Sequence, residues 1–132
     1  MPILSADQQP PFAHFMGMTI TTVTPDLVRA EMPVREELGN RNGVLHGGAI
    51  MALADNLGGT GAVANLREDQ TTMTIESKTN FFAVIPVGDV AIAESIPLHR
   101  GRTTMVWQTR ITRRDGKLAA LVTQTQLVFA AR

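Results

Sequence analysis

Six stretches of the chain carry the side-chain pattern of β-strands. Most of them alternate apolar and polar residues, as a strand with one buried face does. In the second stretch, Val28 and Met32 share one face and Arg29 lies on the other. Turn formers separate the stretches, and Asp115-Gly116 is a strong hairpin signal. The pattern predicts strands over residues 18–23, 27–34, 71–82, 90–98, 103–113 and 117–129, preceded by a short helix or turn over 11–17.

Alternation over residues 71–82 separates a face with large apolar side chains from a polar face. The apolar face holds Met73, Ile75 and Phe81, and the polar face holds Thr72, Thr74, Glu76 and Lys78. In the last strand, Gln124 and Gln126 alternate with less polar neighbours. We expect these two glutamines to face solvent, because amide side chains are mostly exposed in folded proteins.

The longest apolar run, residues 49–64, predicts a buried helix. It is rich in Ala, Leu, Met and Ile, it is longer than a typical strand, and it lacks β-branched enrichment. Helical spacing gathers one apolar face, which holds Ile50, Leu53, Ala54, Leu57, Gly61 and Ala64. A second face holds small or soft residues, namely Met51, Asp55, Gly58, Gly59 and Ala62. Each glycine costs the helix about 1 kcal/mol relative to Ala, which is explained if another backbone packs closely there.

Asp55 is the only charged residue of this run. The residues three and four positions away are Met51, Ala52, Gly58 and Gly59, so no helical ion pair balances its charge. We expect Asp55 to be buried among glycines and alanines, where a carboxylate is costly unless it is hydrogen-bonded or used in chemistry. A hydrogen bond to a neighbouring strand and a catalytic role both remain open.

The segment before the helix combines turn formers with His46-Gly47-Gly48. A helix that begins near Gly48 leaves its first N–H groups unpaired at the positive end of the helix dipole. Glycines let a ligand approach that backbone closely. Such a site suits a phosphate, or a carbonyl oxygen that gains negative charge. A glycine-rich loop in which His46 caps the helix explains the pattern equally well.

The predicted element order is β-β-α-β-β-β-β, an α+β architecture with one helix packed on an antiparallel sheet. The chain reads as a single domain over residues 1–132, with an irregular segment over residues 1–11. One helix covers only part of such a sheet, and this helix is apolar on most sides. Both features indicate that a second subunit buries the remaining surface.

Composition narrows the function mainly by exclusion. A formal net charge of +0 argues against nucleic acid or a membrane surface as the main partner. No segment is long and apolar enough to span a bilayer. The chain has no cysteine, and His14, His46 and His99 lack the spacing of metal ligands, so we expect no metal site. The first residues lack the pattern of a signal peptide, so we expect a cytoplasmic protein.

The pattern Asn40-x-x-Gly43-x-Leu45-His46-Gly47-Gly48, with Asp55 nine residues after His46, resembles the hotdog-fold acyl-CoA thioesterases. It is most similar to their phenylacetate-degradation, or PaaI-like, branch. The resemblance covers the chain from about Phe12 onward and includes the strand order and Pro86-Val87-Gly88-Asp89. It implies a hotdog fold, in which an antiparallel sheet wraps around one long central helix.

The resemblance also implies roles for five residues. Asp55 matches the catalytic carboxylate, a general base or a nucleophile, and the Gly47 N–H matches the donor that polarises the thioester carbonyl. His46 and Asn40 match residues beside the thioester and its sulfur, and Thr74 matches a residue that orients the attacking water. In such relatives the acid and the oxyanion donor come from different subunits. The family therefore implies a homodimer or a dimer of dimers, a homotetramer, with the active site at the interface.

The implied substrate is an acyl-CoA or aryl-CoA thioester, hydrolysed to the free acid and CoA. No cofactor is expected, because coenzyme A is part of the substrate. Candidate contacts for the substrate are Gly48, Met51, Phe81 and Phe82. Arg100 and Arg102 are candidates for the CoA phosphates, since guanidinium groups pair well with phosphate. A solvated basic turn explains these two arginines as well. The acyl group stays open.

Two other functions fit the same pattern. A hotdog enoyl-thioester hydratase or dehydratase would hydrate an enoyl-CoA without releasing a thiol. A non-catalytic acyl-CoA-binding protein would bind the ligand without turnover, although the acid at Asp55 argues against it.

Overall fold

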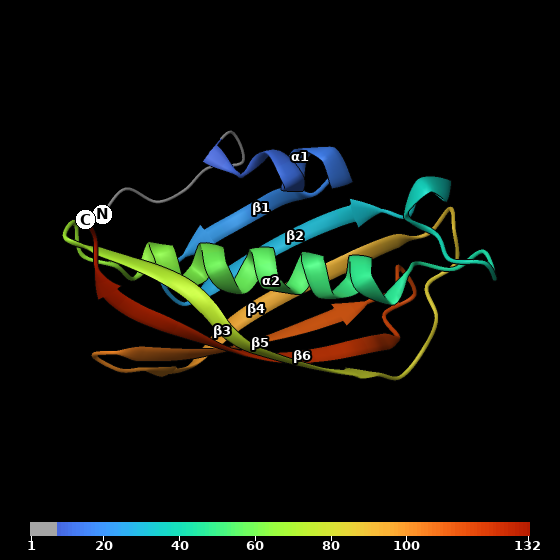
Figure 1. The fold of residues 1–132 in the computed structure, drawn as a ribbon. Helices are drawn as coiled ribbons and strands as arrows, with labels where there is room; N and C mark the ends of the chain where they lie inside the picture. Colours follow the sequence, from blue (N-terminus) through green and yellow to red (C-terminus); the bar gives the residue numbers. More distant parts are fainter. Residues whose placement is uncertain (1–7) are drawn as a thin grey trace.

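Six strands and one long helix follow one another in the predicted order (Figure 1). The computed structural model describes residues 8–132, so most of the predicted irregular segment lies outside the described residues. The strands are β1 (Thr19–Thr24), β2 (Leu27–Pro33), β3 (Gln70–Phe81), β4 (Val90–Arg100), β5 (Thr104–Thr112) and β6 (Leu118–Ala130). The helices are α1 (Pro11–Met16), the 3-10 turn η2 (Glu36–Leu38) and α2 (Gly47–Ala64).

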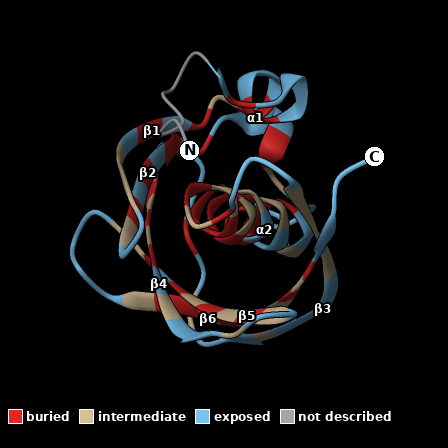
Figure 2. Cartoon of the chain, turned by 90° about the vertical axis from the view of Figure 1, so that its left-hand side faces the viewer, coloured by how far each residue is buried: buried red, intermediate tan, exposed pale blue. Residues whose placement is uncertain are grey.

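The strands form one antiparallel sheet in the order β1-β2-β4-β5-β6-β3. The sheet curves around α2, which Figure 2 shows nearly end-on and surrounded by strands. This is the predicted α+β hotdog fold. Strands β1 and β3 are the two edges of the sheet, and β3 has twelve residues.

Helix α2 buries the apolar face that its spacing predicts. Every residue of that face is buried, namely Ile50, Leu53, Ala54, Leu57, Gly61 and Ala64. Gly61 allows a close approach, because a Cβ there would lie 2.5–2.9 Å from ring atoms of the fully buried Trp107. The second face is divided: Gly58 and Ala62 are buried, whereas Met51 and Asp55 are exposed. The expectation that Asp55 is buried is therefore wrong for the single chain.

A register shift in β3 changes which of its side chains face the helix. Thr74 pairs with Gln126, but the shift makes Glu76 pair with Thr125, on the opposite face. Phe81 consequently turns towards α2, where its ring lies 3.4 Å from the position of a Cβ at Gly47. The prediction that Phe81 shares a face with Met73 and Ile75 is wrong, because the bulge breaks the alternation that it assumed.

Gln124 and Gln126 face the helix and not the solvent. Their side chains are 0% and 1% exposed, so the prediction of two solvent-facing amides is wrong. Both are compensated by hydrogen bonds on the concave side of the sheet. In the described part of the chain, no helix is both long and apolar enough to cross a membrane.

Candidate active site

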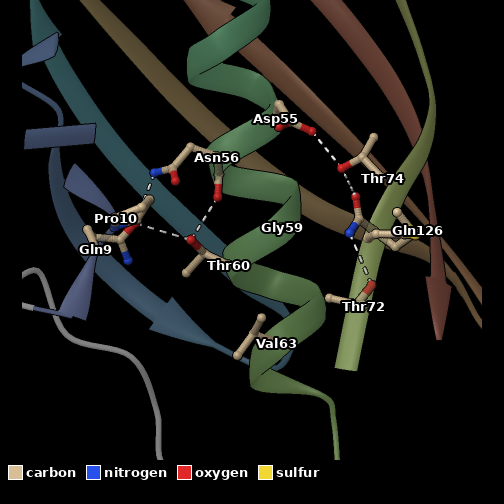
Figure 3. A pocket seen from close by; sticks show the side chains of 11 residues that line it. Gln9, Pro10, Asp55, Asn56, Gly59, Thr60, Val63, Thr72, Thr74 and Gln126 are labelled. Carbon is tan, nitrogen blue, oxygen red and sulfur yellow. Dashed lines mark hydrogen bonds between the residues drawn. The ribbon is translucent and has the colours of Figure 1, made fainter. Parts of the chain in front are cut away.

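Asp55 lies midway along α2 and faces the sheet edge formed by β3. Its Oδ1 atom accepts a hydrogen bond from the Thr74 hydroxyl at 2.7 Å and from Gln124 Nε2 at 3.3 Å. Asp55 is exposed, and Figure 3 shows the Thr74 side chain pointing towards it from β3. Gln124 is fully buried between the sheet and the helix. One carboxylate oxygen is thus held by the protein, and the carboxylate still faces open space.

Two buried glutamines and the half-buried Thr72 extend this pair into a chain of hydrogen bonds. Gln124 Nε2 donates to Gln126 Oε1 at 2.9 Å, and Gln126 Nε2 donates to Thr72 Oγ1 at 3.1 Å. The Thr72 hydroxyl donates to the backbone oxygen of Leu127 at 2.7 Å. Neither glutamine is among the site residues that the sequence predicts. A sequence feature that could have identified them is that polar residues occupy the positions of β3 and β6 that pair beside Asp55.

A pocket of about 280 Å³ opens beside Asp55 and extends over the surface of α2 at Gly59. Thr72, Thr74 and Gln126 line one side of it, and Gln9, Asn56 and Thr60 line the other (Figure 3). Gln9 Oε1 accepts from Asn56 Nδ2 at 2.9 Å and from the Thr60 hydroxyl at 3.3 Å, which fixes the segment before α1 against the helix. Within the described part of the chain, a Cβ at Gly59 would meet no atom within 4 Å, so this side of the pocket is open.

A second group of predicted residues gathers at the start of α2. His46 is the N-cap, and its Nδ1 atom accepts from the Gly48 N–H at 2.8 Å. This bond requires a lone pair on Nδ1, so the neutral ring carries its hydrogen on Nε2. His46 therefore caps α2, which is one of the two roles predicted for it. The Gly47 N–H donates no hydrogen bond to any of residues 8–132.

Asn40 orders the loop that leads into the helix. Its Oδ1 atom accepts from the N–H of Asn42 at 2.8 Å and of Val44 at 3.4 Å. Asn40 and Gly47 line one pocket of about 330 Å³ together with Phe81 and Phe82. A pocket of about 230 Å³ on the other side of His46 is lined by Gly48 and by apolar residues that include Phe12 and Phe15. The start of α2 is therefore flanked by cavities with aromatic walls.

The predicted site residues thus form two groups within one chain. Asn40, His46, Gly47, Gly48, Phe81 and Phe82 lie at the start of α2, whereas Asp55 and Thr74 lie farther along it. Met51 is exposed one turn before Asp55. Gly47 and Asp55 are eight residues apart on one helix, which is about 12 Å along its axis.

The two arginines lie in a third place. Arg100 Nη1 binds Asp26 Oδ1 at 2.7 Å and approaches Asn65, the C-cap of α2, at 3.3 Å. Arg102 is exposed in the turn after β4. Both therefore lie towards the end of α2 that is opposite His46, and their role in CoA binding stays a prediction. Among residues 8–132, no three His, Cys, Asp or Glu side chains are close enough to hold a metal ion together.

The family model of the thioesterase superfamily matches residues 42–120. Over 114 residues the chain is 30% identical to the proofreading thioesterase EntH of Cronobacter sakazakii, covering 86% of this chain and 82% of that protein. A structure of the thioesterase PA1618 of Pseudomonas aeruginosa, a mutant form, superposes with a TM-score of 0.89 at 26% identity, covering 96% of this chain and 91% of that one. The PaaI protein of E. coli superposes with a TM-score of 0.86 at 19% identity, covering 95% and 88%. The chain therefore belongs to the thioesterase superfamily and has the hotdog fold seen in PaaI.

Proposed function

We propose that the chain hydrolyses acyl-CoA or aryl-CoA thioesters, with Asp55 as general base and the Gly47 N–H as oxyanion donor. The observation that carries the proposal is the hydrogen-bonded pair of Asp55 and Thr74 on an exposed face of a helix whose first N–H has no partner among residues 8–132. A thioester needs little else, because a thiolate leaves readily once the carbonyl carbon has been attacked.

The proposed active site needs two copies of the chain. A reacting carbonyl group must lie about 3 Å from both its oxyanion donor and its attacking water. Gly47 and Asp55 of one helix are about 12 Å apart, so they do not serve one thioester. The Gly47 of a second chain would stand opposite Asp55 of the first. The unpaired edge of β3, next to Asp55, offers a surface on which a second copy can add its own strand.

The reaction follows from these positions. Water bound at Asp55 and Thr74 attacks the thioester carbon, and Asp55 takes a proton from this water as the new C–O bond forms. The carbonyl oxygen gains negative charge at the Gly47 N–H. The C–S bond then breaks with its electron pair on sulfur, and the proton held by Asp55 passes to the thiolate. Base catalysis contributes roughly 100- to 10,000-fold and one oxyanion donor roughly 3–4 kcal/mol. Direct attack by Asp55 is the alternative, in which an anhydride forms first.

The substrate class rests on the aromatic cavities at the start of α2 and on the family. The open faces of Phe81 and Phe82, 53% and 57% exposed, suit an apolar part of the thioester. A hotdog protein of Streptococcus mutans, 24% identical with a TM-score of 0.82, has been solved bound to acetyl-CoA. Arg102 and Arg100 are the proposed contacts for the CoA phosphates, and the reaction takes no further cofactor.

Thiol release from a panel of aryl-CoA and acyl-CoA esters tests the activity. Wild-type protein should release CoA from some members of the panel, and Asp55→Ala should retain less than about a tenth of that rate because it lacks the base. Asp69→Asn, which changes an exposed carboxylate elsewhere, is the matched control and should be unaffected. Full activity of a folded Asp55→Ala protein would contradict the proposal. Hydration of an enoyl-CoA without thiol release would point to a hydratase.

The oxyanion donor has a matched pair of variants. Gly47 is the first residue of α2, where proline is tolerated, and the extended backbone of His46 suits a following proline. Gly47→Pro removes the N–H, whereas Gly47→Ala adds a Cβ but keeps the N–H. We expect the proline variant to lose at least about 100-fold in kcat. The alanine variant should remain active, and equal rates in the two would remove Gly47 from the site.

Mixing two inactive variants tests whether the site is shared. A dimer of one Asp55→Ala chain and one Gly47→Pro chain contains one intact site and one doubly altered site. Random reassembly should therefore restore about a quarter of the wild-type activity. No recovery from a mixture shown to contain the mixed dimer would mean that each chain supplies its own site.

A further inference from the structure

The two buried glutamines of β6 are not explained by core packing. Gln124 and Gln126 occupy inward positions between the buried apolar residues Val122 and Val128 of the same strand. Gln124 Oε1 is buried without a hydrogen-bond partner among residues 8–132. A buried polar atom without a partner is unusual in proteins and is often associated with a functional requirement.

The hydrogen bonds fix the orientation of both amides. The Thr72 hydroxyl donates to the backbone oxygen of Leu127, which can only accept, so Thr72 must itself accept from the Gln126 amide nitrogen. Gln126 Oε1 therefore faces Thr74 and Gln124. It follows that Gln124 presents its nitrogen to Gln126 and to Asp55. Each hydrogen bond fixes the next, from the Leu127 carbonyl to the Asp55 carboxylate, so neither amide can be turned over.

Thr74 then has one hydrogen and two acceptors. Its oxygen lies 2.7 Å from Asp55 Oδ1 and 2.6 Å from Gln126 Oε1. An ionised Asp55 attracts the hydroxyl hydrogen more strongly, because hydrogen bonds to a charged group are the stronger ones. The proton reaches Oδ1 through this hydroxyl, because Thr74 passes its hydrogen to Oδ1 as it takes one from the attacking water. Oδ1 then donates back to the Thr74 oxygen, and the new Thr74 hydrogen is free to turn to Gln126. The same three side chains thus satisfy both forms of the carboxyl group.

We propose that Gln126, oriented by Gln124 and Thr72, is a positioning residue that accepts the Thr74 hydrogen while Asp55 carries the proton taken from water. This inference rests on the proposed function, in which Asp55 is the general base. Gln126 acts through Thr74 and holds the carboxyl group in one orientation throughout the reaction.

Gly58 ties this network to the helix. A methyl group at Gly58 would overlap the amide of Gln124, so glycine is needed there for the amide to reach Asp55 and Gln126. Apart from Asp55, no charged side chain among residues 8–132 is hydrogen-bonded to this network. Strand β6 has no titratable residue, α2 has only Asp55, and Glu76 and Lys78 of β3 are exposed beyond the register shift. Glu76 is bonded to Thr125 there.

The test compares Gln126→Leu with Gln108→Leu, a matched substitution on the neighbouring strand outside the network. We expect Gln126→Leu to lower kcat about 10- to 100-fold with KM within about twofold, because a small displacement of a reacting group has that effect. Gln108→Leu should change neither value. In a Thr74→Val background, Gln126→Leu should cost less than about twofold more, because it acts through the hydroxyl that is already lost. A Gln126→Leu protein with wild-type kcat overturns the proposal, and so does a full additional loss in the Thr74→Val background.

Two controls distinguish a failure of the proposed function from a failure of the inference about Gln126. If wild-type protein releases no thiol, or if Asp55→Ala is active, the proposed function has failed. If both behave as proposed and Gln126→Leu is unchanged, only this inference has failed. Should Gln126→Leu not fold, as judged by circular dichroism and size-exclusion chromatography, Gly58→Ala takes its place by displacing Gln124. A loss of kcat in Gly58→Ala at constant KM supports the proposal, and an unchanged kcat overturns it.

Discussion

Two parallel rows of residues run along helix α2, and they have opposite surroundings. Leu53, Leu57 and Gly61 form one row, spaced by four residues, and its two leucines are fully buried. Met51, Asp55 and Gly59 form the other row with the same spacing, where Met51 is 39% exposed and Asp55 is also exposed. One helix thus supplies both the core and the candidate active site, because its two sides meet different parts of the sheet.

The glycine in each row shows the difference most directly. Gly61 is required by packing, since a Cβ there would overlap the ring of Trp107. Gly59 has no packing requirement among residues 8–132, because a Cβ there would meet none of their atoms within 4 Å outside the adjacent turns of the helix. A glycine inside a helix costs about 1 kcal/mol relative to Ala, so Gly59 weakens the helix without a compensating contact in the single chain. Gly59 lines the pocket beside Asp55, and its small size keeps that side of the pocket open.

The largest stability difference between the rows should come from truncating one large side chain in each. Leu57→Ala should lower the free energy of unfolding by about 2–5 kcal/mol, because it opens a cavity in a fully buried position. Met51→Ala, in the exposed row, should cost less than about 1 kcal/mol. Denaturant unfolding at constant protein concentration measures both. Equal losses would mean that Met51 is covered as completely as Leu57 in the assembled protein.

The two glycines give the next largest contrast. Gly61→Ala should destabilise the fold by about 1–3 kcal/mol, because the rigid indole of Trp107 has no room to move. Gly59→Ala should stabilise the helix by up to about 1 kcal/mol. Thermal unfolding of the two variants provides the comparison. A destabilised Gly59→Ala protein would show that a second chain, and not open space, lies over this glycine.

The cap at the start of both rows should have a smaller effect. His46→Ala removes the acceptor for the Gly48 N–H and should cost about 1 kcal/mol. His46→Asn retains a good N-cap and should recover most of that stability. Because asparagine lacks the ring Nε2–H, thiol release by a stable His46→Asn protein measures the chemical role of His46 apart from capping. Wild-type turnover in His46→Asn would leave His46 with capping alone.

The smallest expected effect on stability comes from outside α2, in the turn between β5 and β6. The hydrogen bond from the Arg113 side chain, followed by that from the Lys117 N–H, lowers the pKa of Asp115 from 3.8 to about 2. A lowered pKa means that ionised Asp115 favours the folded state above about pH 4. That contribution is lost as the pH falls towards 2.

Asp115→Asn should therefore be slightly less stable than wild type at neutral pH and equally stable near pH 2. Unfolding curves recorded at pH 7, 4 and 2 check this. A difference that persists unchanged at pH 2 would exclude the carboxylate as its source.

Much of the architecture could be predicted because it depends on local pattern. The alternation of residues 27–34, the apolar run of 49–64 and the Asp115-Gly116 turn each specify one element without reference to the rest. The element order confirmed by the structure then leaves few folds to consider. The start of α2 was also predictable, because the segment around His46-Gly47-Gly48 is a local helix-start signal.

The surroundings of Asp55 could not be predicted in the same way. A single register shift in β3 reversed the face on which Phe81 lies, and alternation carries no sign of a bulge. Gln124 and Gln126 were expected in solvent because glutamine usually is. They are buried because Thr72, Thr74 and Asp55, from two other elements, supply their hydrogen bonds.

The sequence by itself determined the element order, the apolar row of α2 and the candidate acid at Asp55, because each depends on residues close together in the chain. Only the tertiary structure decided which face of β3 meets the helix and which polar groups hold the carboxylate. The physical reason is that burial and hydrogen bonding depend on neighbours from distant segments. Side-chain periodicity reports only which residues share a face of their own element.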